Sequence, residues 1–315
     1  MSTTVNSNAG ASASASTSTR GSDGRVFSYY PGCSQMAMNR AYDVSTRSVA
    51  ARLGLELVEL EDWNCCGATA YVAIREEQAF VLSARNLALA EQAGRPLVTA
   101  CSGCFVVLNK ANKYMAEDPE LRSDITRALA AGSMRYRGTV AVRHFLDVVV
   151  NDVGEETVRA QVTRPLTGLK VAAYHGCQFS RPFGERADPE FPDTMDRLVN
   201  WLGGETVPFA LKAKCCGGLM MTTQPDVGRA LTGKILKAAK EAGADCVITC
   251  CPLCQFNLEG FQRRVGAAVG CDCALPVLYF TQLMGHAFGL DARALALGDS
   301  LTPVAELLHR EAVHS

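Results

Sequence analysis

Ten of the fourteen cysteines in this chain form two copies of one five-point pattern. Each copy has a single cysteine, then an adjacent pair, then a closing C-x-x-C. The first set is Cys33, Cys65, Cys66, Cys101 and Cys104, and the second set is Cys177, Cys215, Cys216, Cys251 and Cys254. The pair and the C-x-x-C are separated by 34 residues in both copies. The single cysteine and the pair are separated by 31 residues in the first copy and by 37 in the second. Because thiolates are metal ligands, the repetition predicts one metal site in each half of the chain.

Five thiolates in one set exceed the needs of an ordinary metal centre. Structural zinc and a cubane iron–sulfur cluster each take four protein ligands. The side chains of adjacent cysteines also diverge, which suits a larger, irregular cluster better than a single small ion. A C-x-x-C by itself is typical of zinc sites and redox dithiols as well. The chemistry of the whole set therefore favours an iron–sulfur cluster over zinc.

Composition narrows the possible classes of protein. A net charge of −1 gives no indication of a nucleic-acid partner or of an acidic membrane surface. No apolar run reaches the ~20 residues that a membrane span requires. We expect a cytoplasmic protein, where a reducing environment makes cysteines ligands or redox groups rather than structural disulfides.

The order of predicted elements is the same in both halves. Strands are expected at 26–30, 55–60 and 97–100, and again at 170–174, 205–209 and 246–249; helices are expected at 35–53, 75–93, 192–202 and 226–242. This alternation predicts an α/β fold with two pseudo-symmetric lobes, each a parallel sheet flanked by helices. Because ligands of such sheets lie at the carboxyl ends of the strands, we expect the clusters there. We expect Gly67 and Gly217, after the pairs, to let the backbone approach a bulky group.

We divide the chain at its changes in composition. Residues 1–25 are rich in Ser, Thr and Ala and are expected to be a disordered tail. The first lobe is expected at 26–160 and the second at 165–290, with a linker near 153–165. Residues 291–315 are expected to be a C-terminal tail or helix.

This layout resembles the cysteine-rich CCG domain in two copies, and it is most similar to the family of heterodisulfide reductase B subunits. The motifs that carry the resemblance are Tyr30-Pro31-Gly32-Cys33, Cys65-Cys66-Gly67, Cys101-Ser102-Gly103-Cys104, Val142-Arg143-His144-Phe145, Tyr174-His175-Gly176-Cys177, Cys215-Cys216-Gly217-Gly218 and Cys251-Pro252-Leu253-Cys254. The resemblance implies that each five-cysteine set holds one noncubane [4Fe-4S] cluster and that the two clusters face a shared cavity.

Two clusters suit the splitting of a disulfide. The reaction takes two electrons, whereas one cluster ordinarily carries one, so two clusters beside the S–S bond can each supply one. Protons must also reach the product thiolates, and His144 and His175 are the candidates because histidine titrates near neutral pH. A packing role for the two histidines is the interpretation that we favour.

The resemblance implies an oxidoreductase subunit that reduces, or in reverse forms, a disulfide or thiol-bound sulfur species. Its expected partners are a ferredoxin-like iron–sulfur subunit and a flavoprotein subunit. An alternative is the CCG electron-transfer subunit of a succinate dehydrogenase, fumarate reductase, or glycolate or lactate oxidase, which exchanges electrons with quinone. A zinc-stabilised scaffold is the third possibility.

Four cysteines lie outside the two sets. Cys246 is expected to be a small buried residue in a strand. Cys250 adjoins Cys251 and competes with it as a ligand, but the repeated spacing favours Cys251. Cys271 and Cys273 form a C-x-C that we interpret as an incidental surface pair rather than a metal site.

Overall fold

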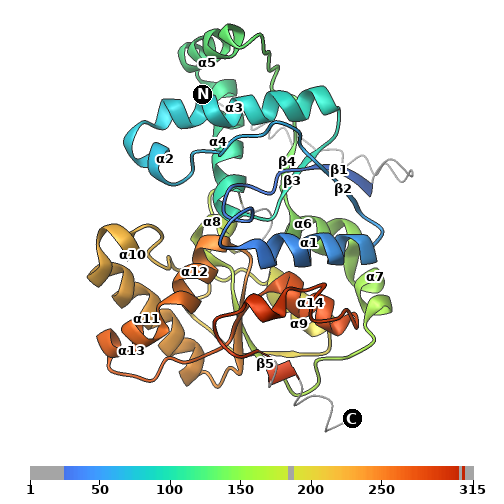
Figure 1. Ribbon diagram of the computed structural model, residues 1–315, viewed down its shortest axis with the longest axis vertical. Coiled ribbons are helices and arrows are strands. Elements are labelled where there is room, and N and C mark those ends of the chain that lie inside the picture. The colour runs from blue at the N-terminus through green and yellow to red at the C-terminus, as the bar shows by residue number, and fades with distance from the viewer. Residues whose placement is uncertain (1–24, 184–187, 305–306, 309–315) are drawn as a thin grey trace, which may run out of the picture.

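The computed structural model describes residues 25–183, 188–304 and 307–308, and it contains two parallel four-stranded sheets (Figure 1). The strand order is β2-β1-β3-β4 in the first sheet and β6-β5-β7-β8 in the second, so the two sheets have the same topology. The strands are β1 (Val26–Tyr29), β2 (Glu56–Glu59), β3 (Leu97–Thr99), β4 (Val142–His144), β5 (Lys170–Tyr174), β6 (Glu205–Thr206), β7 (Cys246–Thr249) and β8 (Val277–Tyr279). The predicted α/β fold with two similar lobes is confirmed.

Helices connect the strands in both lobes. The first lobe contains α1 (Arg40–Arg52), α2 (Ala70–Ile74), α3 (Glu76–Ala93), α4 (Ser102–Glu117), α5 (Pro119–Ala131), α6 (Phe145–Asp147) and the π-helix η2 (Val148–Val153). Helix α7 (Gly154–Gln161) leads into the second lobe, which contains α8 (Gly176–Ser180), α9 (Thr194–Trp201), α10 (Met220–Thr223), α11 (Pro225–Glu241), α12 (Pro252–Gly260), α13 (Gln262–Val269), α14 (Phe280–Ala287) and the 3₁₀-helix η3 (Leu297–Asp299).

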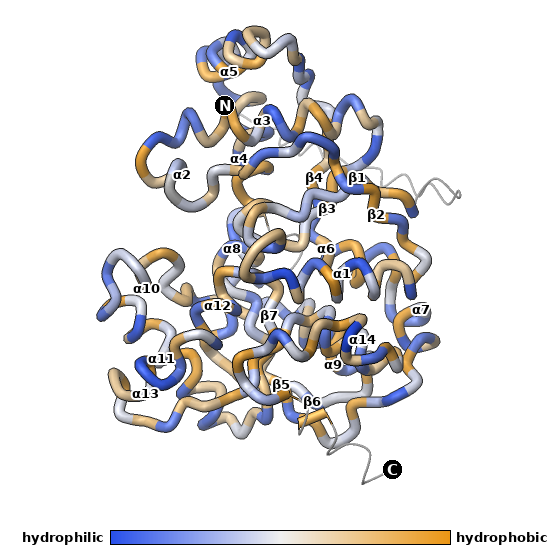
Figure 2. Tube along the Cα trace, in the orientation of Figure 1, coloured by the Kyte–Doolittle hydropathy of each residue, from blue (hydrophilic) through white to orange (hydrophobic). Residues whose placement is uncertain are grey.

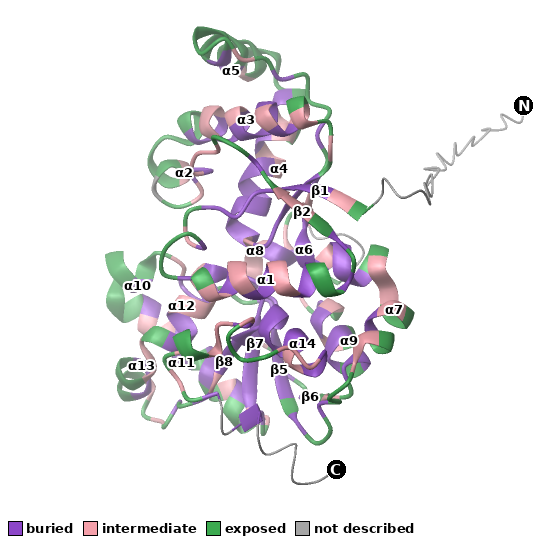
Figure 3. Ribbon diagram, turned by 45° about the vertical axis from the view of Figure 1, so that its right-hand side comes forward, coloured by how far each residue is buried: buried purple, intermediate pink, exposed green. Residues whose placement is uncertain are grey.

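The lobes share a layer of helices between their sheets. One buried cluster includes Val49 of α1 and Phe145 of α6 together with Leu198 of α9 and Leu283 of α14. Tyr42 of α1 stacks on Tyr279 at the end of β8, with ring centroids 4.0 Å apart. In Figure 2 hydrophobic residues follow β5 and this central layer, and in Figure 3 the same region is buried. Burial of this common layer joins the two lobes in one body.

The outer faces of the sheets are covered by different helices. Helices α3 and α4 bury the outer side of the first sheet, and α11, α12 and α13 bury that of the second. Figure 3 shows the outermost helices α5, α10 and α13 with largely exposed surfaces. Each sheet is thus shielded on both sides, as parallel sheets require.

Several features differ from the sequence prediction, among them β6, which ends at Thr206 rather than at 209. The strands β4 and β8 were not predicted, because three residues are too few to show an alternating pattern. The expected linker at 153–165 contains helix α7, whose Val158 is fully buried in the shared core. Helix α1 begins at Arg40 rather than at 35, since turns occupy the preceding residues.

The lobe limits and the tails remain predictions. Residues 1–24 of the expected N-terminal tail lie outside the described part of the chain. Within 291–304, Leu295 is fully buried against Gly285 of α14, and Ser48 of α1 donates to the Ala294 carbonyl oxygen, so this part of the expected C-terminal segment contacts both lobes. No helix in the described ranges has the length and hydrophobicity needed to cross a bilayer.

Candidate metal centres

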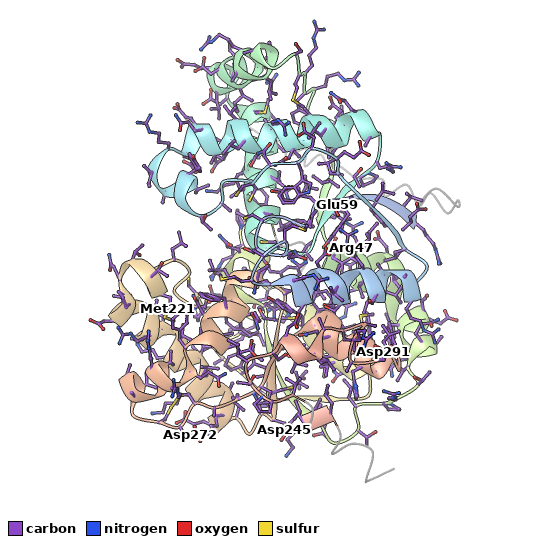
Figure 4. All side chains as sticks on the ribbon, in the orientation of Figure 1. Arg47, Glu59, Met221, Asp245, Asp272 and Asp291 are labelled. Carbon is purple, nitrogen blue, oxygen red and sulfur yellow. A yellow bond between two sulfur atoms is a disulfide. The ribbon has the colours of Figure 1, made fainter. Side chains whose placement is uncertain are left out.

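The single cysteines and the C-x-x-C motifs lie just beyond the carboxyl ends of central strands. Cys33 follows β1 and Cys177 follows β5, while Cys101 and Cys251 follow β3 and β7 and cap the N-termini of α4 and α12. Figure 4 labels Asp245, the residue before β7, at the lower edge of the molecule, so this strand runs from there toward the lobe junction. A helix N-terminus favours negative charge, which suits a cysteine thiolate at this position.

The first set of cysteines comes together. The sulfur atoms of Cys33 and Cys65 are 3.6 Å apart, and those of Cys66 and Cys104 are 3.3 Å apart. A hydrogen bond with Cys65, burial and the nearby thiols, including Cys101, raise the pKa of Cys33. Contacts with Cys101 and Cys66 raise the pKa of Cys104, so each of the five cysteines has a neighbour from its own set at this end of the first sheet.

The second set of cysteines surrounds one cavity. A cavity of about 70 Å³ is lined by all five cysteines of the set and by Ser102 of the first lobe. The sulfurs of Cys216 and Cys254 are 3.5 Å apart. A hydrogen bond with Cys215 and burial raise the pKa of Cys177, as the corresponding contacts do for Cys33. The donor set is purely sulfur, which fits an iron–sulfur cluster.

The first cysteine of each adjacent pair is the one whose thiolate is best stabilised. Hydrogen bonds from Cys33 and Cys66 and from the Gly67 amide lower the pKa of Cys65 to about 2. The equivalent contacts in the second lobe lower the pKa of Cys215 to about 2. The amides of Gly67 and Gly217 lie 3.5 and 3.3 Å from these sulfurs. The direction of both shifts favours the thiolate, which is the form in which cysteine binds metals.

A buried tyrosine orients the loop that carries each pair. The Tyr30 hydroxyl donates to the carbonyl oxygen of Asn64, at 2.8 Å, and the Tyr174 hydroxyl donates to that of Lys214, at 2.6 Å. Each carbonyl belongs to the residue immediately before the pair. Sequence reasoning missed this role, although the matching Tyr-x-Gly-Cys motifs carried the signal.

A hydroxyl group from the next long helix binds the second cysteine of each pair. Ser83 of α3 donates to the carbonyl oxygen of Cys66 at 3.0 Å, and Thr232 of α11 donates to that of Cys216 at 2.8 Å. The two bonds satisfy buried carbonyl groups and tie the loops to the covering helices. The two bonds occupy equivalent positions in the two lobes, as the two cysteine sets do.

Gly67 and Gly217 were expected to let the backbone approach a bulky group, but Gly32 and Gly176 are the glycines that lie beside cysteine sulfurs. A Cβ at Gly67 would lie 3.0 Å from Cβ of Ala79 in α3, and one at Gly217 would lie 3.1 Å from Cα of Gly228 in α11. Gly67 and Gly217 therefore allow close packing of a helix. A Cβ at Gly32 would instead lie 3.0 Å from the sulfur of Cys104, and at Gly176 it would lie 3.2 Å from that of Cys254.

The two cysteine sets meet at the lobe junction. The Ser102 hydroxyl donates to the carbonyl oxygen of Cys250 at 3.0 Å. A hydrogen bond with Cys254 is the main cause that lowers the pKa of Cys251, and backbone amides, including that of Gly103 in the first lobe, lower it further. Gln178 reaches back, and its Oε1 lies 3.2 Å from the position of a Cβ at Gly103. Each lobe therefore supplies groups to the other lobe's site.

Both candidate histidines are fully buried near this junction. His144 Nε2 lies 3.2 Å from the carbonyl oxygen of Cys250, and its Nδ1 accepts the Leu146 amide at 3.2 Å. His175 Nε2 accepts the amide of Met195 in α9 at 3.0 Å. Burial lowers the pKa of His144 to about 4, and burial together with Lys212 lowers that of His175 to about 3. Both rings are neutral at neutral pH, and the proton-transfer role stays a prediction.

The cysteines outside the two sets have other surroundings. Cys246 is fully buried in β7, and the thiol of buried Cys250 donates to the His175 carbonyl oxygen at 3.5 Å. The interpretation of Cys271 and Cys273 as an incidental surface pair is wrong. They form a disulfide, and Cys273 is buried because it packs under α13. Figure 4 labels Asp272 at the lower edge of the second lobe, far from the junction.

Comparisons with known proteins agree with the repeated architecture. A family model described as "Cysteine-rich domain" matches residues 27–109 and 171–259. The chain is 34% identical to the 8-methylmenaquinol:fumarate reductase membrane anchor subunit of Wolinella succinogenes, over 90% of this chain and 99% of that protein. It is 31% identical to a protein of Archaeoglobus profundus that is named as similar to the heterodisulfide reductase B subunit, over 90% and 97%. It is 29% identical to the B subunit of a CoB-CoM heterodisulfide reductase of Methanosarcina acetivorans, over 89% and 95%.

A comparison with solved structures supports the fold. The crystal structure of a hypothetical protein from Helicobacter pylori superimposes with a TM-score of 0.71 and 15% sequence identity. The match covers 90% of this chain and 53% of that chain, so this chain spans about half the length of its structural neighbour.

Proposed function

Because the chain belongs to the cysteine-rich CCG domain family, we propose that it is the cluster-bearing subunit of a heterodisulfide-reductase-like oxidoreductase. In this proposal each five-cysteine set holds one noncubane [4Fe-4S] cluster. The substrate is a disulfide or a thiol-bound sulfur species that lies at the lobe junction. The observation that carries the proposal is Ser102 of the first lobe, which lines the cavity of the second cysteine set and donates to the Cys250 carbonyl oxygen at 3.0 Å.

The residues of the junction have distinct roles in this proposal. The ten cysteines hold the clusters, which when bound supply one electron each to the S–S bond. Gly32 and Gly176 leave room beside the sulfurs of Cys104 and Cys254. Ser102 keeps the two C-x-x-C segments in register through its bond to Cys250.

The histidines position neighbouring segments in this proposal. His144 holds the Cys250 carbonyl and the start of α6, and His175 holds the start of α9. Because burial keeps both rings neutral, they are poor proton stores at neutral pH. Proton delivery by either ring would require its surroundings to open to water during turnover. The electrons would come from a ferredoxin-like subunit and a flavoprotein subunit in the cytoplasm.

A second candidate function is electron exchange with quinone. It is favoured by the relative in Wolinella succinogenes, a subunit of an 8-methylmenaquinol:fumarate reductase, which matches over nearly its whole length. In that case the same clusters would pass electrons between quinol and a flavoprotein. The junction would then face a partner or quinone rather than a disulfide.

Metal content tests the feature that both candidates share. The purified protein is expected to contain about eight iron atoms and about eight acid-labile sulfide ions per chain, as two [4Fe-4S] clusters require. Cys65→Ser and Cys215→Ser variants are each expected to lose the cluster of one lobe. Zinc without sulfide, or full cluster content in both variants, would overturn the proposal.

Substrate titrations separate the two candidates. Adding a thiol to the oxidised protein is expected to produce a new paramagnetic signal in electron paramagnetic resonance if sulfur binds at the clusters. A naphthoquinol is the matched probe for electron exchange with quinone. Reduction of the clusters by the quinol, with no thiol-dependent signal, would favour the quinone function.

A further inference from the structure

The two cysteine sets differ in one buried amide. Asn257 of α12 has no exposed surface, and its Nδ2 donates to the Gly218 carbonyl oxygen at 2.9 Å. The same nitrogen lies 3.3 Å from the carbonyl oxygen of Cys216 and 3.5 Å from its sulfur. A flipped amide would place Oδ1 against two carbonyl oxygens, so the two carbonyls determine which atom faces the sulfur.

The first lobe has no such donor at the matching position. Asn257 follows Cys254 by three residues, and Val107 follows Cys104 by three residues in α4. Val107 is buried and cannot donate a hydrogen bond. The first lobe uses a different amide, Asn86 of α3, which exchanges two hydrogen bonds with the backbone of Asn64. That contact holds the loop without reaching a cysteine sulfur.

The backbone donors around the adjacent pairs are otherwise matched. The amides of Gly67 and Gly217 point at the sulfurs of Cys65 and Cys215. The following amides, of Ala68 and Gly218, lower the pKa of Cys66 and Cys216 in the same way, although other contacts raise both pKa values overall. The Asn257 side chain is therefore an addition to the second site alone.

A hydrogen bond to a cysteine ligand changes the reduction potential of a cluster. Reduction adds negative charge that spreads onto the sulfurs, and an N–H donor stabilises the reduced form more than the oxidised form. The effect is large where water is excluded, because the local dielectric constant is low. Asn257 meets this condition, since its side chain is fully buried.

We propose that the second-lobe cluster has the higher reduction potential of the two and that Asn257 is the positioning residue that sets this difference. The inference rests on the proposed function, since it requires one cluster in each lobe. A one-electron donor of the iron–sulfur class then loads the second-lobe cluster with the first electron and the first-lobe cluster with the second. The two electrons together match the two that an S–S bond or a quinone takes up.

The test is a redox titration of the purified, cluster-loaded protein with dithionite, followed by electron paramagnetic resonance. Asn257→Leu removes the donor and keeps the volume. Loss of the bond is expected to lower the one-electron reduction constant of the second cluster about tenfold, or about 59 mV, while the first cluster is unchanged. Asn257→Asp also removes the N–H groups and adds negative charge, so a larger decrease is expected.

Thr232→Val is the matched control. It removes the bond to the Cys216 carbonyl oxygen, on the same loop, without changing any donor to sulfur. Its potentials are expected to equal those of the wild type. A shift in Thr232→Val as large as that in Asn257→Leu would assign the effect to loop loosening and overturn the proposal.

The remaining outcomes are also decisive. The signal that moves in the Asn257 variants belongs to the second lobe, and the proposal requires it to be the higher-potential signal in the wild type. If the potentials of Asn257→Leu and Asn257→Asp equal those of the wild type, and about eight iron atoms are present per chain, this inference is overturned and the proposed function still stands. If Asn257→Leu loses a cluster, the potential of Asn257→Asp is used instead: a decrease supports the proposal and an unchanged potential overturns it. Wild-type protein without two clusters would instead overturn the proposed function.

Discussion

The hydroxyl group of Ser102 donates a hydrogen bond to the carbonyl oxygen of Cys250, with 3.0 Å between the two oxygens. Ser102 directly follows the first C-x-x-C cysteine, and Cys250 directly precedes the corresponding cysteine of the other lobe. This single bond thus ties the two C-x-x-C segments together across the lobe boundary. His144 reinforces it, because its Nε2 lies 3.2 Å from the same carbonyl oxygen.

Removing this hydroxyl is expected to loosen the junction. Ser102→Ala deletes one buried hydrogen bond and should lower the free energy of unfolding by about 1 kcal/mol, measured by urea denaturation. Ser83→Ala is the control, since it removes an equally buried serine hydroxyl within one lobe. Hydrogen–deuterium exchange near Cys250 should rise only in Ser102→Ala. Equal exchange in both variants would contradict the role assigned to Ser102.

A methyl group at Gly176 is expected to expel the second-lobe cluster. The Cβ would lie 3.2 Å from the sulfur of Cys254, and the backbone has a φ of +71°. Iron should fall from about eight to about four atoms per chain. Gly243→Ala has a similar φ of +80° with nothing within 4 Å, so it should keep its iron and lose only about 1–2 kcal/mol of stability. Equal iron contents in the two variants would count against the placement of Gly176.

The tyrosine contacts are expected to control how long the clusters are retained. Tyr174→Phe removes the hydroxyl that holds the Lys214 carbonyl before the second pair, at a cost of about 1 kcal/mol. Release of iron to a chelator should become faster for one cluster and stay unchanged for the other. Tyr30→Phe is the matched variant in the first lobe and should affect the other cluster. A variant that speeds the release of both clusters equally would show that the loops are not independent.

His144 is expected to make stability depend on pH. Burial lowers its pKa to about 4 in the folded protein, while the Cys250 carbonyl and the Asp147 carboxylate offset part of this decrease. Between pH 6.5 and 4 the unfolded chain binds a proton that the folded chain does not, so stability falls as pH falls. The slope from this group is at most about 1.4 kcal/mol per pH unit. Urea denaturation from pH 7 to 5 should give a shallower slope for His144→Asn, and equal slopes would contradict the assignment.

Local pattern was sufficient for much of the fold. Strand and helix periodicity, with glycine at the helix ends, predicted α3 and α11 to within one residue at each end. The repeated cysteine spacing predicted two similar sites at the ends of parallel strands. The fold prediction is confirmed, because it depends on residues that are close in sequence, whereas the two metal sites remain a prediction that rests on a repeat of the same pattern.

The short elements and the side-chain environment were beyond this reasoning. Strands β4 and β8 have three residues each, and what makes them strands is pairing with β3 and β7. The Cys271–Cys273 disulfide was missed because the C-x-C has no local signal of its burial under α13. The roles of Gly32 and Gly176 were assigned to other glycines, because only the packed structure shows which one faces a sulfur.

The sequence by itself therefore determined the two cysteine sets, the family resemblance and the doubled α/β plan. The tertiary structure decided how the two sets relate to each other. Ser102 and Cys250 are 148 positions apart, and Asn257 lies 41 positions from Cys216. Such contacts arise when the shared helical layer is buried and brings distant segments together. No local pattern of residues encodes which donor then faces which sulfur.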